Sequence, residues 1–186
     1  MVQCLLMGEL ATIVALRSRG PSPSRILHSV CPINHPEDGV SSPSLALSIR
    51  FLLGITLILL GSGIRLWCYH VMGRLFTYEV VITDEHSLIT AGPYAHVRHP
   101  AYTAMTLMLL GIIVISVGNG GYIAECDILS TKARWVVYVW LACASYTVYA
   151  MYKRGEVEDE KLRETFGETW DSYRQRVQRM FIPFVL

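Results

Sequence analysis

The sequence has few charged residues. Asp, Glu, Lys and Arg make up 17% of its 186 residues, against about 25% in a typical soluble domain. Hydrophobic residues reach 52%, and the mean hydropathy is +0.38. The formal net charge is only +1, and no basic block suited to nucleic acid occurs. This composition favours a membrane protein and predicts no nucleic-acid partner.

Paired cysteines are also lacking. The five cysteines are scattered and odd in number, and no two of them form a Cys-x-x-Cys pair, so we expect neither a zinc site nor a disulfide framework. The first twenty residues lack a basic stretch before their apolar run, and Glu9 interrupts that run, unlike a secretory signal peptide. We interpret residues 1–44 as a short apolar segment followed by a loop rich in Pro and Ser.

Long apolar runs fill much of the remaining chain, from 45 to 186. Crossing a bilayer takes about 20 apolar residues, and the sequence predicts membrane helices near 45–69, 101–118 and 134–153. Aromatic residues at both ends of the last run suit the two membrane interfaces. We therefore predict an all-α integral membrane protein, with a bundle of about three to four transmembrane helices.

A charged, helical tail over residues 154–186 follows the last run. Basic residues cluster before the apolar run near 101–118 and after the run near 134–153, which predicts that both regions lie on the cytoplasmic side. Gly167 predicts a helix stop. Beyond it, Trp170, Tyr173 and Val177 share one face of a second short helix.

Polar residues crowd the stretch GPYAHVRHPAYTAM, which leads into the apolar run near 101–118. Pro fits the first turn of a helix, so Pro100 predicts the helix start, with His99 beside its amino end. That end carries partial positive charge and suits a carboxylate. The faces of Tyr94 and Tyr102 suit a cation. S-adenosylmethionine has a carboxylate, a cation and an aromatic base. The alternative is that these residues only anchor the helix among lipid headgroups.

A second polar cluster follows the last apolar run. Arg154 and Glu158 are four residues apart and share a face if the helix continues. In a functional interpretation, Glu158 binds a cofactor and Arg154 binds a substrate carboxylate. The alternative is a solvated helix with one ion pair, worth a few tenths of a kcal/mol. Because both clusters are predicted on the same membrane face, a joint site is more credible than either cluster alone.

These two clusters carry a resemblance. The stretch HSLITAGPYAHVRHPAYTAM, followed after one helical hairpin by RGEVEDEKLRETFGETWDSYRQRVQR, resembles the isoprenylcysteine carboxyl methyltransferase family. These membrane enzymes methylate the C-terminal carboxylate of prenylated proteins with S-adenosylmethionine. The resemblance covers roughly residues 76–183. It implies prenylated protein C-termini and the lipid bilayer as partners, and the endoplasmic reticulum as the location, with the active site facing the cytoplasm. The alternatives are a phospholipid or other small-molecule methyltransferase of the same architecture, or a non-catalytic relative.

The resemblance also assigns roles to individual residues. It implies that Arg154 orients the substrate carboxylate, and that the remaining residues hold the cofactor: His86, Ser87, Leu88, Ile89, Tyr94, His99, Pro100, Ala101, Tyr102, Glu158 and, least directly, Glu79. No metal is called for. Two features depart from the family pattern. The N-terminal third is short and rich in loops, and Gly155 stands where a longer helix-forming residue would hold the helix more firmly.

Overall fold

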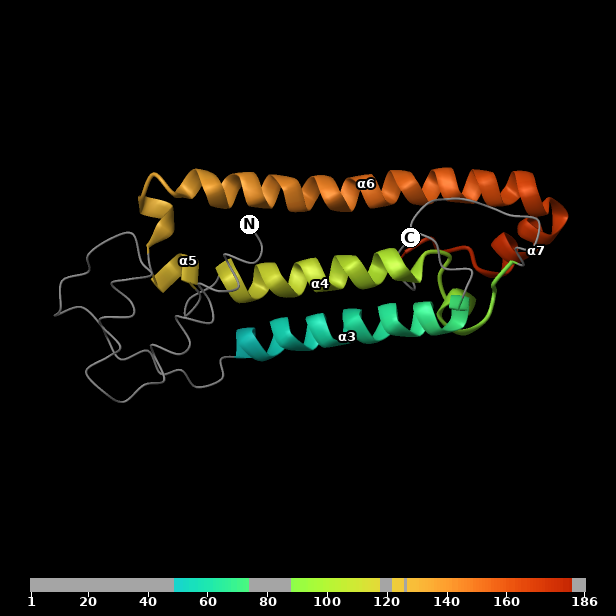
Figure 1. The fold of residues 1–186 in the computed structure, drawn as a ribbon, viewed down its shortest axis with the longest axis horizontal. Coiled ribbons are helices and arrows are strands. Elements are labelled where there is room, and N and C mark those ends of the chain that lie inside the picture. The colour runs from blue at the N-terminus through green and yellow to red at the C-terminus, as the bar shows by residue number, and fades with distance from the viewer. Residues whose placement is uncertain (1–48, 74–87, 118–121, 126, 182–186) are drawn as a thin grey trace. The chain divides into compact units, whose positions relative to one another are not determined.

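The computed structural model describes residues 49–73, 88–117, 122–125 and 127–181, and every regular element in them is helical (Figure 1). The elements are α3 (Ile49–Met72), η3 (Gly92–Ala95), α4 (Pro100–Val117), α5 (Tyr122–Glu125), η4 (Ile128–Ser130), α6 (Arg134–Phe166) and α7 (Glu168–Arg176). Three of them, α3, α4 and α6, are long and apolar enough to cross a membrane. The prediction of an all-α integral membrane protein is confirmed.

The ends of the helices follow local chemistry. Helix α4 begins at Pro100, as predicted, because a proline at the first helical position loses no intrahelical hydrogen bond. Helix α6 runs without a break from the apolar run through the charged tail and ends at Phe166. Gly167 follows with a φ of +52°, a left-handed conformation that glycine adopts at little cost. The predicted helix stop at Gly167 is therefore confirmed.

The chain divides into two compact units, Met1–Thr56 with Leu110–Ala144, and Leu57–Leu109 with Ser145–Leu186. In the first unit, Arg50 lies beside the last turn of α4. Its Nη1 donates to Val114 O at 2.9 Å and also to Ile115 O. The last carbonyls of a helix have no intrahelical partner and carry partial negative charge, so this guanidinium suits them in both respects. A small apolar cluster of Ile123, Ile128 and Val137 completes this unit's core.

In the second unit, a glycine lets α3 approach α4 closely. A Cβ built on Gly61 would lie 2.6 Å from Ala104 O and 2.7 Å from Met108 Cγ. Small residues at such crossings let two membrane helices pack backbone against backbone. Along α3 the buried positions Gly54, Gly61 and Cys68 recur every seven residues, which marks its packed stripe.

The second unit also holds α7, which packs through aromatic residues. Trp170, Tyr173 and Val177 are buried together, and Leu88, Leu162 and Phe166 pack against them. The predicted shared face of the short second helix is thus its buried face. The apolar segment 1–44 and the proposed cofactor residues Glu79, His86 and Ser87 lie outside the described residues.

Candidate functional site

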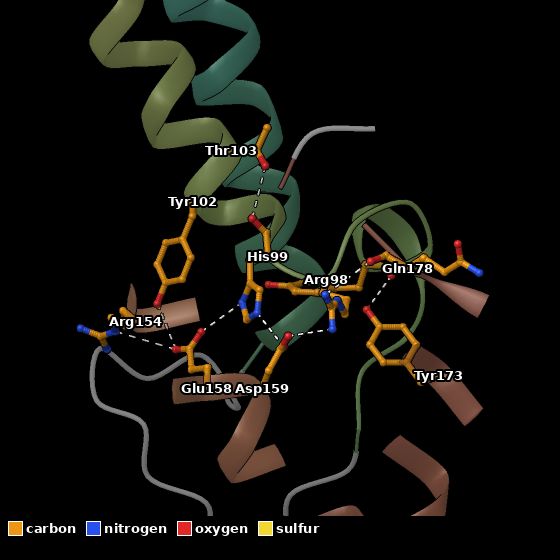
Figure 2. A network of polar contacts seen from close by, with 10 residues as sticks. Arg98, His99, Tyr102, Thr103, Arg154, Glu158, Asp159, Tyr173 and Gln178 are labelled. Carbon is orange, nitrogen blue, oxygen red and sulfur yellow. Dashed lines mark hydrogen bonds and ion pairs between the residues drawn. The ribbon is translucent and has the colours of Figure 1, made fainter. Parts of the chain in front are cut away.

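The two polar clusters predicted from the sequence meet in the second unit. Figure 2 shows the residues before and at the start of α4 facing the charged middle of α6. The contacts form a chain of charges in which Asp159, His99 and Glu158 are consecutive members. Helix α6 must continue beyond its apolar part for this to happen, because both carboxylates belong to its charged section.

His99 is the centre of the network. Its ring is buried, with 6% of the side chain exposed. Nε2 lies 2.8 Å from Asp159 Oδ1, and Nδ1 lies 3.2 Å from Glu158 Oε2. Both ring nitrogens therefore face carboxylate oxygens, which accept hydrogen bonds but cannot donate them when ionised.

Arg98 supplies the inner cation. Its Nη1 lies 2.8 Å from Asp159 Oδ2, and its side chain is 8% exposed. Its Nη2 donates to Gln178 O at 3.4 Å. Asp159 is thus held by a cation on each oxygen, Arg98 on Oδ2 and His99 on Oδ1.

Glu158 is the outer carboxylate. Its Oε1 accepts from the Tyr102 hydroxyl at 3.0 Å and lies 3.9 Å from Arg154 Nε. Exposure of the side chains rises along the network, from 6% for His99 to 24% for Glu158 and 45% for Arg154. Arg154 and Glu158, which were predicted to share a face of the helix, therefore form the most exposed end of the network.

Burial and hydrogen bonding act in opposite directions on His99. Burial lowers the pKa of the imidazole, but its hydrogen bonds to Asp159 and Glu158 and their negative charges raise it more, so the pKa is raised from its ordinary value. Burial lowers the pKa of the Arg98 guanidinium, while the Asp159 charge raises it. Guanidinium groups stay protonated in proteins, so Arg98 remains a cation.

The amino end of α4 is covered by residues 178–181, which we call the C-terminal segment. The amide of Arg98 donates to Arg179 O at 3.0 Å, and that of His99 donates to Met180 O at 2.9 Å. The Thr103 hydroxyl donates to Phe181 O. We expected this helix end to receive a carboxylate from a ligand. In the structure, main-chain carbonyls of the same chain accept from these two amides.

Gly155 makes room for the C-terminal segment. A Cβ on Gly155 would lie 2.9 Å from Phe181 Cζ, 3.1 Å from Met180 Cε and 3.4 Å from His99 Cδ2. We expected a longer residue to hold this turn of α6 more firmly, but the C-terminal segment occupies the space that its side chain would need. The absent side chain is what allows residues 180 and 181 to pack between α6 and His99.

Aromatic rings lie around the same point. The rings of His99 and Tyr102 stack with centroids 5.6 Å apart, and the Phe181 ring lies 5.8 Å from the first and 6.2 Å from the second. Tyr152 of α6 is 5.6 Å from Phe181. These rings form one group, in which Tyr102 also contacts Glu158 through its hydroxyl.

Other proposed cofactor residues have different surroundings. The Tyr94 hydroxyl donates to Met72 Sδ at 2.8 Å. The main-chain carbonyl of Tyr94 accepts from the Tyr173 hydroxyl at 2.8 Å. Burial raises the pKa of the Tyr94 phenol. Burial also raises the pKa of Tyr173, to about 12. Leu88 packs against the buried cluster of α7. Ile89 and Ala101 are partly exposed, and Pro100 is buried.

Two members of the network were not assigned a role from the sequence. These two residues are Arg98 and Asp159. The available signal was the Glu158–Asp159 pair itself, because adjacent helical residues point about 100° apart and one carboxylate can face inward while the other faces outward. The sequence did not indicate which side of α6 would be covered.

Fold and site together define a helical membrane protein with a charged network where its long helices α4 and α6 meet. Residues 53–164 match the isoprenylcysteine carboxyl methyltransferase family, and the chain belongs to that family. It is 33% identical over 134 residues to protein-S-isoprenylcysteine O-methyltransferase B of Arabidopsis thaliana, which covers 71% of this chain and 58% of that protein.

Two further relatives carry related names. A probable protein-S-isoprenylcysteine O-methyltransferase of Oryza sativa subsp. indica is 31% identical over 135 residues, covering 72% of this chain and 61% of that protein. The protein-S-isoprenylcysteine O-methyltransferase of Saccharomyces cerevisiae is 25% identical over 152 residues, covering 81% and 56%. The chain thus spans 56–61% of the length of these relatives. No solved structure matches it.

Proposed function

We propose that this chain methylates the C-terminal carboxylate of a prenylated cysteine, with S-adenosylmethionine as the methyl donor. The observation that carries the proposal is the outer end of the network, where the exposed Arg154 cation and the partly exposed Glu158 carboxylate lie on one face of α6 beside Tyr102. Membership of the family, and the names of the relatives, support the same reaction.

The residues at the outer end fit S-adenosylmethionine by their chemistry. Glu158 has a carboxylate that accepts hydrogen bonds from hydroxyl or amino groups. The rings of Tyr102 and Phe181 present faces that attract a cation such as a sulfonium. When bound, S-adenosylmethionine supplies a methyl group on a positively charged sulfur. We propose Glu158 and Tyr102 as its contacts here, with Leu88, Ile89, Tyr94, Pro100 and Ala101 shaping the surroundings.

The acceptor carboxylate needs no general base, because a C-terminal carboxyl is already ionised at neutral pH. Alignment and removal of water from the nucleophile are then the main contributions of the protein. A guanidinium has five N–H donors in a planar fork. Arg154 therefore pairs with Glu158 and still orients an incoming carboxylate from the exposed side.

The candidate membrane spans support a route for the substrate through the bilayer. An apolar prenyl chain partitions into the bilayer, so it reaches the site between the helices rather than from water. The basic residues flanking α4 and α6 favour placing the site on the cytoplasmic face, where prenylated C-termini are. We propose the endoplasmic reticulum as the membrane, by analogy with the family.

The test is methyl transfer from labelled S-adenosylmethionine to N-acetyl-S-farnesylcysteine in membranes that contain the chain. We expect a base-labile methyl ester from the wild type. In Arg154→Ala the rate of ester formation should fall at least tenfold, because a hydrogen bond to a charged group, here the substrate carboxylate, contributes roughly 1.5–3 kcal/mol. The control is Arg163→Ala, on the same helix but paired with Asp171, which should keep the activity.

The alternatives give different results in this assay. A folded wild type that binds S-adenosylmethionine but makes no ester contradicts the prenylcysteine assignment and points to a lipid or small-molecule acceptor. A folded wild type that binds no S-adenosylmethionine contradicts methyl transfer altogether and leaves a non-catalytic membrane protein.

A further inference from the structure

The inner half of the network, from Arg98 to the His99–Glu158 contact, is mostly buried. Arg98 and His99 are almost fully buried, and Asp159 is 15% exposed. Each contact in this half joins a cation to a carboxylate, in the order Arg98, Asp159, His99 and Glu158. The two carboxylates face both nitrogens of the imidazole, so the protonation state of the ring follows from these two contacts.

The geometry of His99 supports a doubly protonated ring. A neutral imidazole donates from one ring nitrogen and has a lone pair on the other. With a carboxylate oxygen 2.8 Å from Nε2 and another 3.2 Å from Nδ1, a neutral ring would direct that lone pair at a negative oxygen. The raised pKa of His99 agrees with this geometry.

The position of Glu158 depends on the ring behind it. Its Oε2 faces His99 Nδ1, while its Oε1 faces Tyr102 and Arg154. A glutamate has three rotatable bonds, and two anchors on one oxygen do not fix the rotation of the whole carboxylate. The His99 contact supplies the third point and comes from the buried side.

We propose that Asp159 is a positioning residue, which holds the His99 ring through Nε2 so that Nδ1 fixes the Glu158 carboxylate toward the ligand. Arg98 holds the second oxygen of Asp159 and keeps it in place. Among the described residues, neither Nε nor Nη1 of Arg98 has a well-aligned hydrogen-bond partner, so Arg98 interacts with Asp159 as an ion pair across 2.8 Å. This inference rests on the proposed function, and it assigns Asp159 a role without contact to substrate or cofactor.

The charged and titratable groups around His99 come from every element packed on it. Helix α6 contributes Glu158 and Asp159, with Arg154 beyond Glu158. Helix α4 contributes Tyr102, and the chain before it contributes Arg98. The C-terminal segment covers the ring with Phe181, which does not titrate. Among the described groups, the two carboxylates alone favour the protonated ring, so removing one of them must lower the pH at which His99 loses its proton.

The first experiment measures the protonation state of the His99 ring. Full-length protein labelled with ¹⁵N-histidine is placed in lipid nanodiscs, and a His99→Gln variant assigns the His99 signals among the six histidines. We expect an imidazolium in the wild type at pH 7. In Asp159→Asn the titration midpoint should fall by about one pH unit or more, as for loss of one charge-assisted hydrogen bond. Glu160→Gln, which removes an exposed charge from the next position, should leave the midpoint in place.

The second experiment measures the binding of S-adenosylmethionine to the protein. The Kd in Asp159→Asn should rise about tenfold, as typically follows loss of a residue that orients a ligand-binding group, while Glu160→Gln matches the wild type. In the methylation assay the KM for S-adenosylmethionine should rise by the same factor, with kcat changed less than twofold. A merely structural defect would instead lower the active fraction, and so lower kcat with KM unchanged.

The outcomes separate the two proposals. A His99 midpoint that does not move in Asp159→Asn, or a Kd that stays at the wild-type value although the midpoint moves, overturns the positioning role. A wild type that binds no S-adenosylmethionine overturns the proposed function, while the ring experiment still reports on Asp159. Should Asp159→Asn fail to fold, Asp159→Glu and the wild type serve instead. The charge-conserving variant should keep the imidazolium, and a neutral His99 in the wild type at pH 7 overturns the inference.

Discussion

Replacing Gly155 with alanine should destabilise the protein, although the same change stabilises most helices. Alanine is favoured over glycine by about 1 kcal/mol in a helix interior. Here the new Cβ would lie 2.9 Å from Phe181 Cζ, whereas carbon atoms prefer roughly 3.5–4.0 Å. The ring must therefore retreat by roughly 0.6–1.1 Å within its aromatic neighbours. Overpacking of this kind costs about 1–3 kcal/mol, so we expect a net loss of about 1 kcal/mol.

The assay is reversible unfolding in mixed micelles, with circular dichroism as the readout and a double-mutant cycle as the design. Gly155→Ala is measured in the wild type and in Phe181→Ala, where the obstructing ring is gone. We expect loss in the first background and gain in the second, a coupling of about 1–2 kcal/mol. Gly63→Ala is the control, because a Cβ there meets nothing within 4 Å. If Gly155→Ala behaves like Gly63→Ala in both backgrounds, the close packing of the C-terminal segment on α6 is refuted.

Two further predictions concern stability. The folded pKa of His99 lies above the unfolded value of roughly 6.5, so the stability that the protonated ring contributes is fully present below about pH 6.5 and is lost as the pH rises through the folded pKa. The difference in unfolding free energy between the wild type and His99→Gln should therefore shrink from pH 6 to pH 9. A difference that stays constant over this range contradicts the ion contacts of His99. Gly61→Leu should destabilise the protein by at least about 2 kcal/mol, because a Cβ at position 61 would lie 2.6 Å from Ala104 O. The control Gly63→Leu should not destabilise it. Equal effects of the two variants in the same unfolding assay argue against the close crossing of α3 and α4.

Much of the helical framework was predictable from the sequence because its signals are local. A proline at the helix start and a glycine after its end act within one turn, and the apolar runs needed only counting. The pairing of Arg154 with Glu158 follows from helical spacing once α6 continues. These features depend on neighbours along the chain, and each of them was found.

The inner half of the site was not predictable in this way. The contacts of Asp159 with Arg98 and His99 join residues about 60 positions apart, and spacing within one helix does not show which carboxylate turns toward another. The packing at Gly155 was not predictable for the same reason. A glycine in a helix looks like a local weakness unless the segment that occupies its open side is known, and that segment is 25 residues further on.

The hydrogen bonds from Arg98 and His99 to residues 179 and 180 bear on the order of events during biosynthesis. Residues 179 and 180 follow α3, α4 and α6 along the chain, so they are synthesised after these helices. The membrane-inserted portion therefore exists for a time with the amino end of α4 uncovered and the ring of His99 open on one side. The site is not complete before these residues are made, and a chain that stops before residue 179 lacks both hydrogen bonds.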